Sequence, residues 1–167
     1  MTSDARLETP RLVLRPIGFG DVPRCIEILV AGGGEGARDH AGLFREEVEH
    51  WAAHGFGPWV ALARESGDVV GTFDVNYAGP GLEGINANEV EVGWMVDPRL
   101  WGRGLATEGA RAACDDAYER AGVTSLVAYI RPDNTPSLRV VEKLGMTYEG
   151  DGRSRDGEDV RIFRMRR

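Results

Sequence analysis

Residues 89–107 read EVEVGWMVDPRLWGRGLAT, and this stretch carries the strongest structural signal in the chain. Polar and apolar side chains alternate up to Val96, which predicts a β-strand with one buried face. Pro98 ends the strand because proline has no amide hydrogen to give to a sheet. Gly102 and Gly104 then open a long helical segment. The order is therefore strand, tight turn, helix.

The turn after this strand, residues 99–107, has the character of an anion-binding cradle. Two glycines without Cβ atoms let consecutive amide groups converge, and the start of a helix adds the positive end of its dipole. The spacing does not match the phosphate loop GxxxxGK[ST], and residue 107 is threonine where the dinucleotide motif GxGxxG needs glycine. We therefore predict a site for another kind of pyrophosphate.

The chain before this stretch predicts helices between short strands. The expected elements are a strand over 11–15, a helix over 22–30 capped by Asp21, a glycine loop at 32–34, a helix over about 39–54, a hairpin of 58–63 and 69–77, and a loop over 78–87. In the second helix we expect one apolar stripe, with the acidic residues mainly outside. That stripe consists of Leu43, Phe44, Val48 and Trp51, and the acidic residues are Glu46, Glu47 and Glu49.

The chain after the cradle predicts a parallel crossover. A helix runs to about Arg120, a β-branched run covers 123–130, and a second helix begins near Asn134. Segments 146–149 and 160–165 then predict a closing hairpin. Strand, helix, strand in this order places two strands side by side and parallel.

Composition bounds the class of protein. The chain has 167 residues and a formal net charge of −7, so we expect one domain over 1–167 and no nucleic-acid partner. Cys25 and Cys114 have no metal-like spacing, and His50 and His54 lack the glutamate of HExxH, so we predict buried thiols and no metal. With no apolar run long enough to span a membrane, we expect a cytoplasmic protein.

Arg99, Gly102 and Gly104 match the acetyl-CoA motif [Q/R]-x-x-G-x-[G/A] of the GNAT superfamily of N-acetyltransferases, which the chain resembles. Segments 9–16, 91–94, 101–108 and 134–146 are similar to its RimJ/RimL branch. The resemblance implies the α/β class, with a mixed, mostly antiparallel sheet of about six to seven strands. It also implies that the sheet is splayed in the middle and flanked by about four helices.

The resemblance also implies where acetyl-CoA binds. The pantetheine arm adds to the exposed strand edge near Trp94, with the Met95 amide facing the thioester carbonyl, and Asn134 holds the arm while capping its helix. Four basic residues are candidates for screening the phosphates: Arg99, Arg103, Arg139 and Lys143. The expected donor site comprises Trp94, Met95, Val96, Arg99, Gly102, Arg103, Gly104, Leu105, Ala106, Thr107, Asn134 and Ser137.

For catalysis the resemblance points to two side chains. Glu91 is the candidate base that draws a proton from the amine through water, and Glu89 on the same strand face is the reserve. Ser137 is the candidate acid for the departing thiolate. The tyrosine that many superfamily members use as an acid is missing here, because Val141 occupies its position.

We expect direct acetyl transfer in a ternary complex, with Met95, Glu91 and Ser137 as the catalytic groups. The acceptor is a protein N-terminal α-amine or a small-molecule amine, and the sequence leaves both open. Two other functions also stay open, a non-catalytic module that senses acyl-CoA and a nucleotide-binding domain. An exposed sheet edge or the closing hairpin would also allow a homodimer.

Overall fold

The computed structural model describes residues 5–33 and 40–167. Gly34 of the expected glycine loop and residue 39 of the expected second helix lie outside these ranges. In the described part the strands are β1 (Leu7–Glu8), β2 (Leu12–Pro16), β3 (Trp59–Ala63), β4 (Val69–Tyr77), β5 (Val90–Val96), β6 (Ser125–Ile130), β7 (Thr147–Arg153) and β8 (Asp159–Arg166). The helices are α1 (Val22–Ala31), α2 (His40–His54), α3 (Leu105–Glu119) and α4 (Thr135–Leu144), with single 3₁₀ turns at Phe19–Asp21 and Pro98–Leu100.

All the described strands join one mixed sheet in the order β1-β2-β3-β4-β5-β6-β8-β7. Every neighbouring pair is antiparallel except β5 and β6, which are parallel as the crossover predicts. The expected fold is confirmed. The sheet has eight strands where six to seven were expected, and one of them is the two-residue β1.

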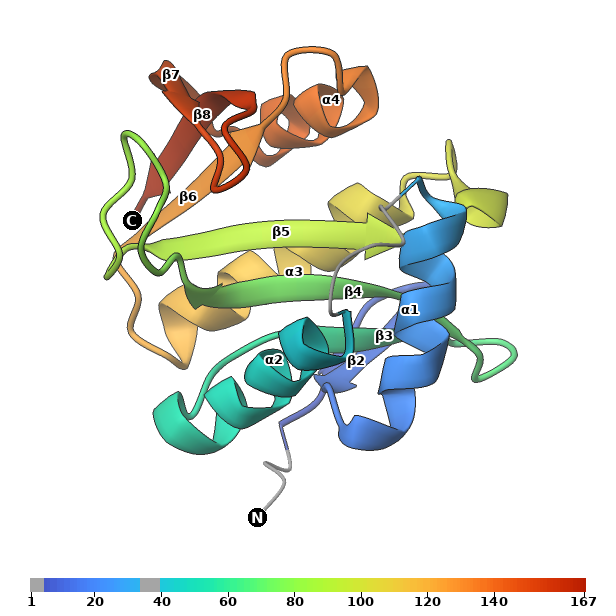
Figure 1. Ribbon diagram of the computed structural model, residues 1–167. Helices are drawn as coiled ribbons and strands as arrows, with labels where there is room; N and C mark the ends of the chain where they lie inside the picture. Colours follow the sequence, from blue (N-terminus) through green and yellow to red (C-terminus); the bar gives the residue numbers. More distant parts are fainter. Residues whose placement is uncertain (1–4, 34–39) are drawn as a thin grey trace.

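The sheet is splayed between β5 and β6. Their pairing is limited to Val90 with Leu126 and Glu91 with Val127, although β5 continues to Val96. Figure 1 shows β6 turning away from β5 toward α4, which leaves one edge of β5 without a neighbouring strand. The splay therefore opens the sheet beside the predicted cradle.

Helices cover both faces of the sheet. In Figure 1, α1 and α2 lie in front of the sheet, and α3 lies behind it. Helix α3 approaches β4 closely because Gly109 has no side chain, and an added Cβ would lie 2.1 Å from the ring of Phe73. The main core fills both layers and includes Leu14, Trp59 and Phe73, each at most 1% exposed.

Two local expectations are wrong. Asp21 precedes α1, but its carboxylate makes no capping bond and instead accepts the Gly18 amide at 2.9 Å and pairs with Arg15 at 2.7 Å. In α2, Leu43 is 49% exposed, whereas Glu47 turns toward the sheet with a buried oxygen. Glu47 lies three residues after Phe44 and four before Trp51, and this spacing puts it on the inward face.

Candidate functional site

The cradle holds a run of backbone amides with no acceptor. The Leu100 amide donates to Asp97 O at 2.8 Å and the Trp101 amide to Pro98 O at 3.2 Å. The next recorded amide bond comes from Glu108 to Gly104 O at 3.1 Å, the first of α3. Among the described residues the amides between them, 102–107, have no partner. Both cradle glycines have left-handed φ angles, +75° at Gly102 and +78° at Gly104, which only glycine adopts without strain.

Asp97 fixes the start of the cradle. Its carboxylate, only 5% exposed, is 2.5 Å from the Arg24 guanidinium and 2.6 Å from that of Arg99, and it also accepts the Arg99 amide at 3.0 Å. Hydrogen bonds from Arg99 outweigh the effect of burial and hold the pKa of Asp97 well below its usual range. The guanidinium and amide of Arg99 are thus engaged within the chain, although its side chain is 76% exposed, and its contact with a phosphate stays a prediction.

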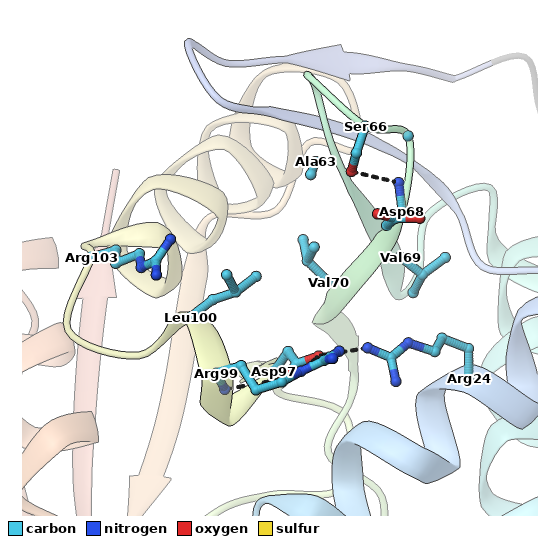
Figure 2. A pocket seen from close by; sticks show the side chains of 11 residues that line it. Arg24, Ala63, Ser66, Asp68, Val69, Val70, Asp97, Arg99, Leu100 and Arg103 are labelled. Atoms are coloured by element: carbon cyan, nitrogen blue, oxygen red, sulfur yellow. Dashed lines mark hydrogen bonds and ion pairs between the residues drawn. The ribbon is translucent and has the colours of Figure 1, made fainter.

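A cavity of about 830 Å³ lies beside these ion pairs, between the β3–β4 turn, α1 and the cradle. Figure 2 shows Arg24 and Arg99 converging on Asp97, while Arg103 extends from the cradle on the other side of Leu100. Of the four expected phosphate-screening residues, Arg103, Arg139 and Lys143 are exposed, and no ion pair is recorded for them in the described part of the chain.

The open edge of β5 presents the amides of Trp94 and Val96. The Asp97 amide donates to Val70 O at 2.8 Å, which continues the register that pairs Met95 with Thr72 of β4. Because backbone groups alternate sides along a strand, the Met95 amide also points at β4. The assignment of the Met95 amide to the thioester carbonyl is therefore wrong. On the open edge Val96 O accepts the Trp101 indole at 2.7 Å.

The first turn of α4 faces this edge. Asn134 caps the helix, its Oδ1 accepting the Ser137 amide at 3.2 Å, as its type predicts. The Trp94 indole crosses from β5 and donates to the Ser137 hydroxyl oxygen at 3.3 Å. This contact leaves the hydroxyl hydrogen of Ser137 available for donation to another group.

Three carboxylates gather on the α1 and α2 side of β4 and β5. Asp74 lies opposite Gly93 in the register, so it is a diagonal neighbour of Glu91, and Glu47 reaches them from α2. Each has a fully buried oxygen without a hydrogen-bond partner in the described part of the chain. Asn76 donates to the other oxygen of Glu91 at 3.3 Å.

Burial raises the pKa values of these three carboxyl groups. Desolvation, with the nearby charge of Asp74, raises the pKa of Glu91 to about 7, against the opposing charge of Arg155 and the Asn76 hydrogen bond. Desolvation likewise raises the pKa of Glu47, together with the charges of Asp74 and Glu91, and that of Asp74. A carboxyl that titrates near neutral pH can act as a base there.

Glu89, the reserve base, is engaged elsewhere. It forms an ion pair with Arg164 at 2.7 Å, and this hydrogen bond lowers the pKa of Glu89 despite its partial burial. It is therefore ionised and held, whereas no cation among the described residues forms an ion pair with Glu91.

Glu47, Asp74 and Asp97 were not among the site residues predicted from the sequence. The signals were present, because Asp74 and Asn76 alternate with the apolar Phe73 and Val75 along one strand. Asp97 follows the strand immediately and precedes a proline. An acidic residue at a buried position in such a pattern marks a candidate site.

The remaining candidates have structural roles. Cys25 and Cys114 are buried free thiols, and desolvation raises the pKa of each to about 12. His50 is 2.8 Å from Phe56 O through Nδ1 and accepts the Tyr77 amide at 3.2 Å through Nε2. Within 5–33 and 40–167, no set of three His, Cys, Asp or Glu side chains could hold a metal ion, and no helix is long and apolar enough to cross a membrane.

Comparison with known proteins identifies a family and several relatives. The acetyltransferase (GNAT) domain family matches residues 11–147. The FsC-acetyl coenzyme A-N(2)-transacetylase of Aspergillus fumigatus is 30% identical over 159 residues, covering 85% of this chain and 65% of that protein. The uncharacterized protein YkkB of Bacillus subtilis is 34% identical over 95 residues, covering 57% and 53%. The chain spans less than two thirds of the length of these curated relatives.

Solved structures extend the similarity over nearly the whole chain. An acetyltransferase from Agrobacterium tumefaciens has a TM-score of 0.83 at 30% identity, covering 99% of this chain and 96% of that one. RimJ from Mycobacterium smegmatis, in complex with CoA-disulfide, has a TM-score of 0.73 at 21% identity, covering 93% and 81%. At that identity the RimJ comparison supports the fold alone.

Proposed function

Because the chain belongs to the acetyltransferase (GNAT) domain family, we propose that it transfers the acetyl group of acetyl-CoA directly to a primary amine, without acetylation of the enzyme. The observation that carries this proposal is the run of unpartnered amides at 102–107 beside the open edge of β5. Amides at a helix N-terminus suit a diphosphate, and an unpaired strand edge suits the amide-containing arm that follows it.

The donor side of the mechanism uses backbone groups. Acetyl-CoA, when bound, supplies a thioester whose carbonyl carbon accepts the amine. The cradle amides hold the diphosphate, and the edge groups of Val96 and Trp94 pair with the arm. Trp94 lies farther from the cradle along β5 and closer to Glu91, so we assign its amide to the carbonyl oxygen, where negative charge develops. Val96 O already accepts the Trp101 indole, and its second lone pair remains for the arm.

Glu91 receives the proton of the acceptor. An amine reacts only when neutral, and a simple alkyl ammonium ion with a pKa near 10.4 is almost fully protonated at neutral pH. Glu91 takes that proton through water and the amine nitrogen then bonds to the carbonyl carbon. That nitrogen loses its second proton to water, and the carbon–sulfur bond breaks. The sulfur leaves with the electron pair. Ser137, oriented by the Trp94 indole, donates its hydroxyl hydrogen to that sulfur and is reprotonated from solvent.

The acceptor amine lies on the side of β4 and β5 that carries Glu47, Asp74 and Glu91, and this side favours an acceptor with positive charge. Only one carboxylate is needed as a base, yet Glu47 and Asp74 each add a buried oxygen with no partner among the described residues. Arg155, the described cation whose charge acts on Glu91, donates to Ala78 O, Pro80 O and the Tyr129 hydroxyl. We therefore assign the acceptor to the primary amines that carry a second positive charge.

Matched pairs of amines test this assignment. One pair is 1,4-diaminobutane and 1-aminobutane, and the other is a peptide beginning with lysine and the same peptide beginning with norleucine. Each pair differs by one ammonium group. Release of the CoA thiol measures kcat/KM, and we expect the dication of at least one pair to be favoured about tenfold or more. Asp74→Asn should reduce that preference, whereas Glu46→Gln on the outer face of α2 should leave it intact.

The two parts of the proposal fail separately. If thiol is released equally from both members of each pair, acetyl transfer stands and the charge assignment is wrong. If CoA binds but no amine of the panel or of a wider set of N-terminal peptides and aminoglycosides releases thiol, the protein is a binding module and the catalytic proposal is wrong.

A further inference from the structure

We propose that Arg11 and Glu108 form a clasp that holds the cradle in its diphosphate-binding shape and so sets the preference for CoA over donors without a diphosphate. The inference rests on the proposed function, since it concerns the same donor site. Both residues are positioning residues, because their contacts are with the protein chain.

The clasp joins the start of β2 to the start of α3. Arg11 donates from Nε to Glu108 Oε2 at 2.7 Å, and its Nη2 lies 2.6 Å from the same oxygen. Glu108 Oε1 accepts the Arg11 amide at 2.9 Å and the Thr9 hydroxyl at 2.6 Å. The Glu108 carboxylate is 15% exposed on its side chain, so these contacts are partly shielded from water. Both oxygens of the carboxylate are therefore engaged.

The clasp reaches the cradle through one carbonyl. Arg11 Nη1 donates to Arg103 O at 2.6 Å, and this carbonyl lies between the two left-handed glycines. In a trans peptide the carbonyl and the next amide point in opposite directions. With Arg103 O turned toward Arg11, the Gly104 amide must point the other way, toward the side where an anion can accept it. Arg11 therefore fixes the orientation of a central amide of the run.

Charge gives a second reason for the clasp. Glu108 lies in the first turn of α3, beside the amides that receive the diphosphate. A lone carboxylate there would repel an anion, and the Arg11 guanidinium compensates it. Burial alone would raise the pKa of Glu108, but the hydrogen bonds from Thr9 and Arg11 lower it. The carboxylate thus stays ionised and paired.

The test compares two donors that share the thioester and the arm. Acetyl-CoA carries the diphosphate, and S-acetylpantetheine does not. For Arg11→Ala we expect kcat/KM with acetyl-CoA to fall about tenfold or more through KM, with a change below twofold for S-acetylpantetheine. Arg64→Ala is the matched control, because Arg64 donates to Thr9 O at 2.8 Å without reaching the cradle. Arg11→Lys keeps the charge without the planar fork and should lie between.

The rate of trypsin cleavage reports the shape of the cradle in the ligand-free protein. Trypsin cleaves after Arg103, whose carbonyl the clasp holds, so Arg11→Ala should speed the appearance of fragments 1–103 and 104–167 in the ligand-free protein. Arg64→Ala should not. Weaker use of acetyl-CoA with unchanged cleavage would mean that Arg11 acts on the ligand directly, which overturns the inference. Unchanged use of acetyl-CoA by Arg11→Ala also overturns it, whereas a wild-type protein that uses neither donor contradicts the proposed function itself.

Discussion

Glu91 illustrates at the scale of one residue how the site is prepared for chemistry. Its carboxylate is placed by strand alternation beside Asp74, loses most of its contact with water, and forms no ion pair within residues 5–33 and 40–167. These features cost stability, because an ionised carboxylate is better solvated in water. They also give a base whose pKa of about 7 suits proton transfer at neutral pH.

We predict that kcat/KM depends on pH through the ionisation of Glu91. The ionised fraction of this carboxyl rises as the pH passes through about 7, so kcat/KM should rise through the same range and then level off. Glu91→Gln should lower kcat/KM by about 100-fold at pH 8 and remove this rise. Glu89→Gln should retain it, because Glu89 is ionised and paired with Arg164. A rise that persists in Glu91→Gln would show that another group is the base.

Glu47 provides a prediction on stability. The folded protein raises the pKa of Glu47 above the unfolded value of about 4.3, so the native state binds more protons across that interval. Stability is then lost as the pH rises through it. At pH 8, Glu47→Gln should increase the free energy of unfolding by about 1–3 kcal/mol, measured in urea. Glu46→Gln should change it by less than about 0.5 kcal/mol.

At the scale of elements, the site depends on how closely α3 lies against the sheet. The helix carries the cradle at its N-terminus and packs along β4 and β5. Gly109 permits this approach, since the ring of Phe73 occupies the space where a Cβ would lie. A shift of the helix would move the amides at 102–107 relative to the edge of β5.

Gly109→Ala tests this packing. The added methyl group meets a ring that is 1% exposed and cannot move into solvent, so we expect a loss of about 1–3 kcal/mol in the free energy of unfolding. Gly20→Ala, where no atom lies within 4 Å of the added Cβ, is the control and should cost little. Urea unfolding with an unchanged m-value checks both variants. Equal stability of Gly109→Ala and wild type would contradict the close packing.

At the scale of the whole molecule, the splay divides the sheet into two parts. Strands β1 to β5 form one part and β6 to β8 the other, joined by only two residue pairs between β5 and β6. A ligand arm that adds to β5 in the opening would lie between these parts. Donor binding should therefore stabilise the molecule as a whole. A homodimer and a cytoplasmic location stay predictions.

A comparison of coenzyme A with ATP distinguishes binding of the pantetheine arm from binding of the phosphates alone. With coenzyme A at 100 times its Kd, linkage predicts about 2.7 kcal/mol of added stability, seen as a higher melting temperature. ATP has phosphates but no arm, so at the same concentration we expect a much smaller shift. Amide hydrogen exchange should slow at Trp94 and Val96 with coenzyme A only. Equal shifts with ATP and coenzyme A would favour a nucleotide-binding domain and contradict the assigned open edge.

The sequence alone predicted the parts of the site that depend on local rules. The alternation of β5 and the Asn134 cap both follow from neighbouring residues, and the structure confirms them. The inward position of Glu47 also follows from its spacing to Phe44 and Trp51, although its charge favours the outward position that was expected.

What required the tertiary structure were relations between distant segments. Which side of β5 the Met95 amide faces depends on the register with β4, and a shift of one residue reverses it. The clasp joins Arg11 to Glu108, and the three carboxylates come from α2, β4 and β5. No local sequence pattern contains either set of residues. The sequence by itself therefore determined the elements and the family to which the chain belongs. Only packing decided which amides and carboxylates meet, because partners far apart in the chain are chosen by the fold.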